Sequence, residues 1–402
     1  MRGHLEKRGK DTWTIIIERG INPLTKKRER IKRAVQGTKP EVTCVMNEML
    51  YQLQTGTYVE PTNLTFSAYL EHWLENYCEL NLAPKTMQSY KMEIANHIEP
   101  QLGSISLEKL TPMHLQTYYV HLQKKGRKDK TGGLSPRTVV YHHRIIREAL
   151  KHAFKWQLVI RNVADAVEPP RFKRKEMKVM SKEQVLEFIK KIEAHRDYAI
   201  IYVALYTGLR QGELLGLTWS NVDLACKTLF VRQQMQYLKG KGYIYREPKT
   251  PKSRREIPLS AEVITLLKEI HREQAQLKLM ASPIGKDQQD LDPSLIPGEK
   301  SELLEYEDND LVFCLNNGKP LDPTNLTKRF KKLARKHGHP EMRFHDMRHT
   351  FATLMLAAGV EAKKVQDLLG HESIGTTLDT YGHVLPNMRR DAMDRLSQFM
   401  GE

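Results

Sequence analysis

The sequence predicts a multidomain protein that combines a small α+β N-terminal domain, an all-α central domain and a mainly α C-terminal domain with a small antiparallel β-sheet. Three observations lead to this fold class. The length of 402 residues suggests two or three domains. A β-branched run near the N-terminus precedes a long stretch of helical periodicity. Two proline-containing linkers interrupt the chain, so we expect domains at residues 1–57, 64–168 and 178–402.

The composition favours a polyanionic partner. The formal net charge is +16, and an excess of this size is typical of proteins that bind nucleic acid or an anionic membrane. No apolar run approaches the roughly 18 residues that span a bilayer, and the first residues lack the apolar core of a signal peptide. We therefore expect a cytoplasmic protein that binds nucleic acid and has no membrane partner.

The first domain concentrates positive charge. Residues 1–40 carry 12 Lys and Arg but 4 Asp and Glu, a net +8. Residues 12–20 and 28–35 predict two β-strands, and a helix follows at 39–56. This could be a solubilising tail, but disordered tails lack β-branched runs such as Thr14–Ile17. A DNA-binding module is favoured, with candidate contacts at Lys26, Lys27, Arg28 and Arg30.

The central domain is predicted to be helical throughout. Four stretches repeat apolar residues at helical spacing, and Pro84, Pro112 and Pro136 stand where helices begin. Lys85 and Arg137 are its candidate DNA contacts. The proline pair at 169–170 then ends the domain. Beyond it, a capping box formed by Ser181 and Gln184 is expected to open the C-terminal domain.

The C-terminal domain contains four short stretches rich in basic residues. The first, TGLRQGELLGL, places Glu213 three residues after Arg210 on one helical face, where the carboxylate can orient the guanidinium. The second, PKTPKSRREIPL, predicts a tight β-hairpin over 247–259 with Lys249 near its tip. An ordinary surface ion pair and a solvated turn are the simpler interpretations of these two stretches.

The other two stretches add histidines and a tyrosine. FHDMRHTFAT predicts a helix start with His345 and Arg348 on one face, and LLGHESIGTTLDTYGHV carries His371 and Tyr381. Taken alone, a tyrosine in this position is more often a packing residue. The significance of these residues therefore depends on the whole set.

The sequence offers little support for a metal site. His345 and His349 have the i, i+4 spacing of a helical zinc site, but Arg348 would place a fixed cation beside the ion, and the intervening carboxylate is Asp346. No CxxC pair occurs, so we expect reduced, structural cysteines and neither a zinc ribbon nor a disulfide framework. The cysteines are Cys44, Cys78, Cys226 and Cys314.

Two arginines, a lysine, two histidines and a tyrosine together suit a phosphodiester. Arginine forks bind two phosphate oxygens at once and stabilise the charge of a pentacoordinate transition state. A tyrosine hydroxyl can attack phosphorus, and a lysine can protonate the departing oxygen. No metal or other cofactor is then required.

These four stretches, in this order, resemble the tyrosine recombinase (phage integrase) family over roughly residues 178–390. The helical domain resembles the core-binding domain of that family, and the N-terminal sheet resembles its arm-binding domain. The resemblance implies the tyrosine recombinase fold. It also implies that Arg210 and Arg348 grip the scissile phosphate, that Glu213 orients Arg210, that His345 is a base or phosphate donor, and that His371 is a second phosphate ligand.

The resemblance also assigns the covalent step. Tyr381 would be the nucleophile that forms a 3′-phosphotyrosine, and Lys249 would be the general acid for the 5′-hydroxyl. Lys252 and Arg254 are expected to contact DNA nearby. The interpretation of Tyr381 as a packing residue is therefore the weaker of the two.

We therefore expect a site-specific DNA recombinase, the integrase of a phage or integrative mobile element. Expected partners are double-stranded DNA attachment sites of core and arm type, further copies in a homotetramer on DNA, an excisionase and a DNA-bending host factor. One alternative is a chromosome-dimer or inversion-type tyrosine recombinase, which the basic N-terminal sheet disfavours. Another is a non-catalytic DNA-binding regulator, which would not need Lys249, His371 and Tyr381 together.

Overall fold

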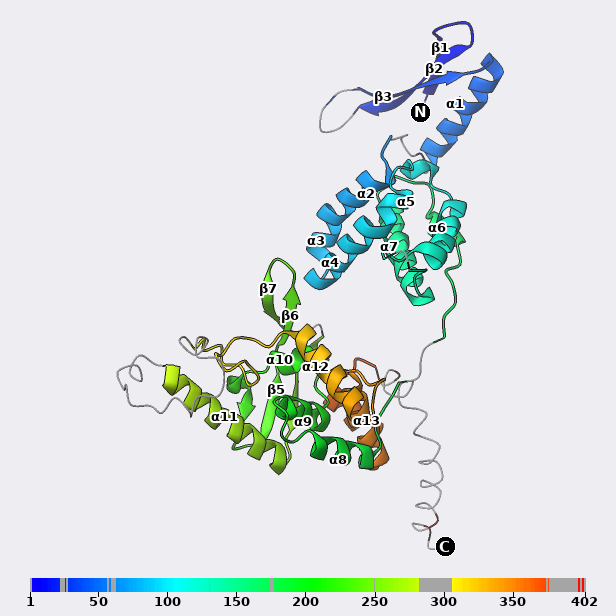
Figure 1. The fold of residues 1–402 in the computed structure, drawn as a ribbon. Helices are drawn as coiled ribbons and strands as arrows, with labels where there is room; N and C mark the ends of the chain where they lie inside the picture. Colours follow the sequence, from blue (N-terminus) through cyan, green and yellow to red (C-terminus); the bar gives the residue numbers. More distant parts are fainter. Residues whose placement is uncertain are drawn as a thin grey trace. The chain divides into compact units, whose positions relative to one another are not determined.

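The computed structural model of the chain forms two compact units, residues 1–174 and 175–402 (Figure 1). Each unit is described by itself. The structure describes residues 2–21, 26, 28–55, 58, 63–129, 131–173, 177–248, 250–281, 306–373, 375, 397 and 400. No helix in these ranges is long and apolar enough to cross a bilayer.

The first unit begins with a three-stranded antiparallel sheet and one helix (Figure 1). Its elements are β1 (Arg2–Lys7), β2 (Thr12–Ile21), β3 (Arg28–Gln36) and α1 (Lys39–Gln54). Ile15 and Ile17 of the central strand pack against Val42 and Met49 of α1. The two expected strands and the helix are present. The edge strand β1 was missed because Leu5 is its only apolar residue.

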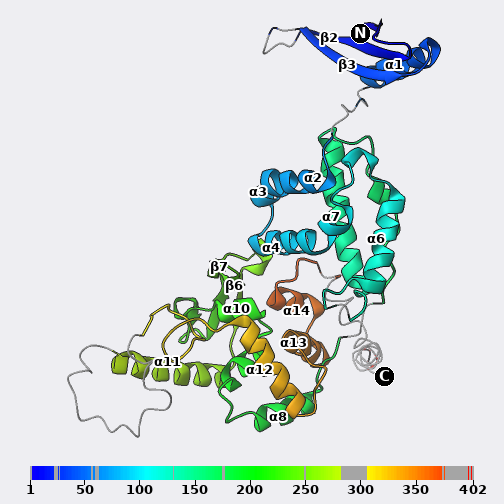
Figure 2. The same ribbon diagram turned by 45° about the horizontal axis from the view of Figure 1, so that its top comes forward.

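The rest of the first unit is helical, as predicted, and α6 lies along α7 (Figure 2). Pro84, Pro112 and Pro136 each begin a helix. The helices and short 3₁₀ or π turns are α2 (Phe66–Trp73), η1 (Leu74–Cys78), α3 (Glu79–Asn81), α4 (Pro84–Glu93), η2 (Ile94–Ile98), α5 (Glu99–Leu102), η3 (Leu107–Lys109), α6 (Pro112–Lys125), α7 (Pro136–Lys155) and η4 (Val163–Ala166).

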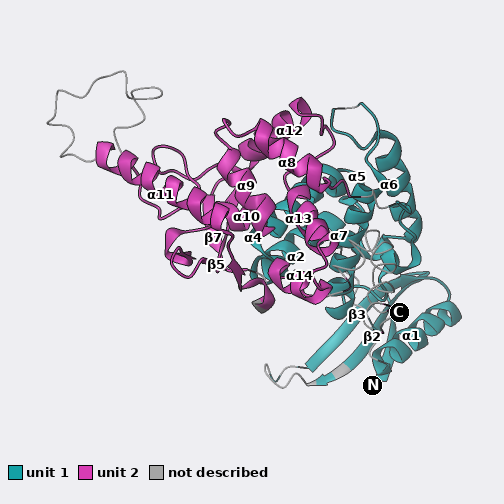
Figure 3. Cartoon of the chain, turned by 90° about the horizontal axis from the view of Figure 1, so that it is seen from below, with its two compact units in different colours: residues 1–174 teal, residues 175–402 magenta. Residues whose placement is uncertain are grey.

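The second unit, magenta in Figure 3, contains helices and two small antiparallel sheets, β4-β5-β8 and β6-β7. Ser181 and Gln184 form the expected capping box at its first helix. Its elements are α8 (Lys182–Lys191), α9 (Tyr198–Thr207), α10 (Gln211–Leu215), η5 (Trp219–Asn221), β4 (Val222–Asp223), β5 (Thr228–Val231), β6 (Gln234–Leu238), β7 (Gly242–Arg246), η6 (Pro251–Ser253), β8 (Arg255–Pro258), α11 (Ala261–Ala281), α12 (Pro323–Lys336), α13 (Asp346–Ala357) and α14 (Ala362–Leu369).

The predicted β-hairpin over residues 247–259 is wrong. Strand β7 pairs with β6, whereas β8 pairs with β5 in a different sheet of order β4-β5-β8. The segment therefore connects two sheets, and its 3₁₀ turn begins at Pro251. The pairing follows burial, because Ile257 of β8 lies opposite Leu229 of β5 and both side chains belong to the apolar core.

Candidate active site

The junction between α9 and α10 positions the first arginine. Helix α9 ends at Gly208, which adopts the left-handed conformation with φ of 62°, and Arg210 is the N-cap residue of α10. Arg210 Nη1 donates to Glu213 Oε1 at 2.7 Å, and the Arg210 backbone N–H donates to Oε2 at 2.9 Å. The carboxylate therefore orients the guanidinium as the spacing predicted.

A second arginine binds the same carboxylate. Arg255 Nη1 and Nη2 donate to the two oxygens of Glu213 at 3.2 and 2.8 Å. Glu213 is only 4% exposed. Burial raises the pKa of its carboxyl, but Arg255 first, and then Arg210 and Arg348, outweigh that effect and lower the pKa to about 2. Glu213 is therefore ionised at neutral pH despite its burial.

Three arginines cap the C-terminal end of α14. The carbonyl of Leu368 accepts from Arg255 Nε at 2.6 Å, and the carbonyl of Leu369 accepts from Arg348 Nη2 at 2.5 Å. The next carbonyl, of Gly370, lies 3.5 Å from Arg210 Nη2. These carbonyls have no partner within the helix, and cations are favoured at a helix C-terminus. The three guanidinium groups therefore converge just before His371.

Arg348 also ties this helix end to the start of the site. It lies on α13, is 2% exposed, and donates from Nη1 to the carbonyl of Gly208 at 2.8 Å. One guanidinium thus joins the end of α9 to the end of α14. Gly208 is also closely packed, because an added Cβ there would overlap the ring of Phe351.

Three histidines near the arginines have lowered pKa values. Burial, and then Arg348 and Arg210, lower the pKa of His371 to about 3. Burial, and then His345, lower the pKa of His349 to about 4. The same effects, with Arg348 as the main neighbouring charge, lower the pKa of His345, whose ring stands perpendicular to that of His349 at 4.9 Å between centroids. All three rings are therefore neutral at pH 7.

The structure brings the four expected phosphate ligands near the same arginine cluster. Arg348 and Arg210 lie close enough to His345 and to His371 to lower the pKa of each ring, and the same two arginines lower the pKa of Glu213. Lys27, Lys249 and Tyr381 lie outside the described residues.

The remaining predicted DNA contacts are on the surface. Lys252 Nζ donates to the carbonyl of Glu372 at 3.1 Å, beside His371, whereas Arg254 pairs with the exposed Glu247. In the first unit, exposed predicted contacts occur at Lys26, Arg28, Arg30, Lys85 and Arg137.

Sequence reasoning selected Arg254 and passed over Arg255. Arg255 lies two residues before the buried Ile257 on β8, and successive side chains of a strand point to opposite faces. Arg255 therefore points inward to Glu213, while Arg254 is exposed. The alternation of side chains along this strand, counted back from the apolar Ile257, is the sequence signal that indicates an inward-facing Arg255.

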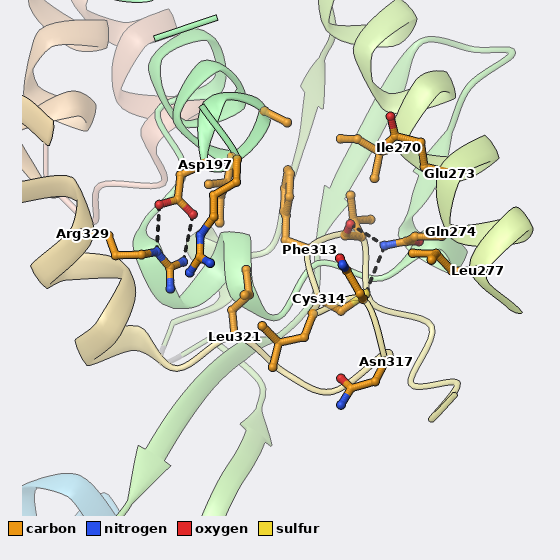
Figure 4. A pocket seen from close by; sticks show the side chains of 16 residues that line it. Asp197, Ile270, Glu273, Gln274, Leu277, Phe313, Cys314, Asn317, Leu321 and Arg329 are labelled. Carbon is orange, nitrogen blue, oxygen red and sulfur yellow. Dashed lines mark hydrogen bonds and ion pairs between the residues drawn. The ribbon is translucent and has the colours of Figure 1, made fainter. Parts of the chain in front are cut away.

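A cavity of about 470 Å³ lies elsewhere in the second unit. Its wall includes Asp197, which accepts two hydrogen bonds of 2.8 Å from Arg329, and Gln274 and Phe313 (Figure 4). Arg210, Arg255 and Arg348 do not line this cavity, and neither do the three histidines with lowered pKa values. The candidate site therefore lies outside this cavity, and Arg210 is its most exposed arginine, with 35% of the side chain accessible.

Comparisons with known proteins agree on one family. The phage integrase family matches residues 178–388, and the N-terminal SAM-like domain of phage integrases matches residues 65–123. A tyrosine recombinase XerC-like protein of Caldanaerobacter subterraneus subsp. tengcongensis is 27% identical over 97% of both chains. The ICEBs1 integrase of Bacillus subtilis is 24% identical over 96% of this chain and 97% of its own.

A solved structure confirms the expected fold class. The Tn1549 transposon integrase, in complex with a circular intermediate DNA, matches with a TM-score of 0.63 and 23% identity. The match covers 82% of this chain and 98% of that chain. The helix-rich architecture with small antiparallel sheets is therefore shared.

Proposed function

Because this chain belongs to the phage integrase family and is a site-specific recombinase that cuts and rejoins DNA, we propose that Arg210 and Arg348 bind the scissile phosphodiester. The observation that carries this proposal is the convergence of their guanidinium groups with that of Arg255 at the carbonyl groups of residues 368–370. The side chain of Arg210 is 35% exposed and can reach a ligand from the surface.

The charges of this site suit the transition state of phosphoryl transfer. The pentacoordinate phosphorus carries extra negative charge, which fixed guanidinium groups stabilise without reorganisation. Ionised Glu213 holds Arg210 and Arg255 in place. The neutral rings of His345 and His371 each retain one N–H that can donate to a phosphate oxygen.

We assign the covalent step to Tyr381. Its hydroxyl gives its proton to the neutral ring of His345, and Oη forms a bond to phosphorus while the bond from phosphorus to the 5′-oxygen breaks, which leaves a 3′-phosphotyrosine. Lys249 gives its proton to the departing 5′-oxygen. The 5′-hydroxyl of another strand then attacks the phosphotyrosine, releases Tyr381 and restores a phosphodiester. Each step exchanges one phosphoester bond for another, so no cofactor is consumed.

The likeness to integrases of mobile elements supports an integrative role. We propose that residues 1–57 bind arm sites, that residues 64–168 bind core sites, and that residues 178–402 catalyse strand exchange as a homotetramer on DNA. An excisionase and a DNA-bending host factor would set the direction. The enzyme would act in the bacterial cytoplasm or nucleoid. A chromosome-dimer role remains the alternative, because one full-length relative is XerC-like.

The decisive test is Tyr381→Phe on a nicked suicide substrate that contains the core site. The variant keeps the ring and should bind the DNA, but it should form no covalent adduct on a denaturing gel. The matched control is Tyr237→Phe, at an exposed residue of β6, which should form the adduct at the rate of the unmodified protein. An adduct formed by Tyr381→Phe would exclude Tyr381 as the nucleophile.

A further inference from the structure

The central helical domain contains a cluster of metal-ligating side chains. Glu93 ends α4, His97 lies one turn later in η2, and His142 lies in the middle of α7. One ligand atom from each of the three lies within 4.8 Å of both others, and no other such group of three occurs among the described residues. The residues are far apart in sequence and meet only in the folded domain.

The buried histidine is oriented toward the other two residues. His142 is completely buried, and its Nδ1 lies 2.8 Å from the hydroxyl of Tyr118. Its Nε2 lies 3.1 Å from Glu93 Oε2, yet it has no hydrogen-bond partner within the described chain. A buried polar atom without a hydrogen bond is costly. At this distance from the carboxylate oxygen, the nitrogen either carries a proton or shares a metal ion with that oxygen.

We propose that Glu93, His97 and His142 bind a divalent transition-metal ion of the Zn²⁺ class. Two imidazole nitrogens and one carboxylate oxygen are a common zinc donor set, and bond lengths of about 2.0–2.2 Å place tetrahedral ligand atoms roughly 3.3–3.6 Å apart. Here Glu93 Oε2 lies 3.1 Å from His142 Nε2 and 3.9 Å from His97 Nε2. The observed distances bracket that separation.

The surroundings suit such an ion. The Tyr118 hydroxyl oxygen can accept a hydrogen bond from the Nδ1–H of His142. The Nε2 lone pair is then free to bind the metal, as is usual when a ligating histidine has an outer partner. The side chains of Glu93 and His97 are 16% and 15% exposed, so water can supply the fourth ligand. Lys128 also lies near this group, where its charge lowers the pKa of Glu93, and it donates a hydrogen bond to Asn96. Its positive charge would compete with the metal ion for the Glu93 carboxylate.

Binding would join the α4–η2 segment to α7. An ion that binds the folded domain and not the unfolded chain raises its stability by mass action. The proposed role is structural, because none of the three ligands belongs to the arginine site of the second unit. The proposal is therefore independent of the recombinase mechanism.

The test uses full-length protein stripped with EDTA and then titrated with Co²⁺ and with Zn²⁺. We expect one Co²⁺ per chain with the visible bands of a tetrahedral ion, displacement of Co²⁺ by Zn²⁺, and a rise in the melting temperature of the helical domain. His97→Gln should abolish the bands and the rise, and because this side chain is partly exposed the variant should fold.

His143→Gln is the matched control for His142→Gln. His143 is the next residue on α7, is also buried, and also bonds a tyrosine, with 2.9 Å between its Nδ1 and the Tyr119 hydroxyl. It lies outside the cluster, so metal binding should persist in His143→Gln and disappear in His142→Gln. Absence of Co²⁺ binding to the unmodified protein, or unchanged binding by His97→Gln, would overturn the proposal and leave a proton between Glu93 and His142.

Discussion

At the scale of single residues, Glu213 organises the site. It is a buried carboxylate that binds Arg210 on one side and Arg255 on the other. Burial of a lone carboxylate would be very unfavourable, so the ion pairs are needed for Glu213 to remain ionised. Arg255 in turn holds the carbonyl of Leu368, three residues before His371. Arg255 is thus a positioning residue that acts through Glu213 and the end of α14.

The first prediction concerns Arg255→Met. Loss of one partner of a buried ion pair should lower the free energy of unfolding by about 3 kcal/mol, at the lower end of the usual range because Arg210 remains bound to Glu213. DNA cleavage should also slow, since the turn before His371 loses a contact. Urea unfolding and single-turnover cleavage measure the two effects.

Arg254→Met is the control for that prediction. Arg254 pairs with the exposed Glu247 on the surface, and exposed pairs contribute at most about 1 kcal/mol. Its loss should leave stability nearly unchanged. Equal destabilisation by the two variants would show that the buried pair has no special role.

The second prediction concerns pH. The pKa of His371 is lowered to about 3 and that of His349 to about 4, whereas an unfolded histidine titrates near ~6.5. The unfolded chain therefore binds more protons between those values, and the stability contributed by the neutral rings is present above about pH 6.5 and is lost as the pH falls.

We expect the urea midpoint of the second unit to fall when the pH is lowered from about 7 to about 5. His371→Gln removes one of the three site histidines whose pKa is lowered and should make that fall smaller. A midpoint that does not change with pH in the unmodified protein would contradict the lowered pKa values.

At the scale of elements, the site is assembled from helix ends. The end of α9, the first turn of α10 and the end of α14 supply backbone groups or side chains, and α13 and β8 each contribute one arginine. Helix ends are suitable because their free carbonyl groups bind guanidinium donors. The left-handed Gly208 and Gly370 allow the chain to turn at both ends.

The third prediction tests this assembly with Gly208→Ala. A residue other than glycine at positive φ costs about 1–2 kcal/mol, and here the new Cβ would also overlap the ring of Phe351. The overlap should add roughly 1–3 kcal/mol, and cleavage should fall because the Gly208 carbonyl is an acceptor for Arg348.

Gly240→Ala isolates the backbone part of that cost. Gly240 has φ of 84° and no atom within 4 Å of an added Cβ, and it lies in the turn between β6 and β7. Unfolding free energies of the two variants should therefore differ by the cost of the overlap alone. A similar loss in both variants would mean that the Phe351 contact relaxes freely.

At the scale of the whole molecule, different parts of the chain have separate apolar cores and different net charges. The sheet and helix of residues 2–55 have an apolar core of their own, separate from the core of the central helices. Half of the net positive charge lies in residues 1–40. A separate core with its own excess charge supports the proposal of an independent arm-binding module.

The fourth prediction is that deletion of residues 1–56 spares cleavage of an isolated core site and abolishes integration into a complete attachment site. Loss of phosphate contacts should also flatten the salt dependence of binding to arm-containing DNA. Filter binding at several salt concentrations and an integration assay measure both. Undiminished integration by the truncated protein would favour the chromosome-dimer or inversion alternative.

The fold and most of the described site residues could be predicted because their signals are local. Helical periodicity, first-turn prolines and the box at Ser181 and Gln184 depend on neighbours within one or two turns, and so does the pairing of Arg210 with Glu213. Local signals failed at β1, where Leu5 is the only apolar residue. They failed again at the supposed hairpin before β8.

Local patterns in the sequence were thus enough to predict the central helices, the capping box at Ser181 and the pairing of Arg210 with Glu213. The tertiary structure alone decided which strand β8 joins, and with it that Arg255 and not Arg254 binds Glu213. It alone brought Glu93 on α4 to His142 on α7. The physical reason is that strand partners and helix contacts are chosen by burial of apolar surface between segments distant in sequence, which no short pattern records.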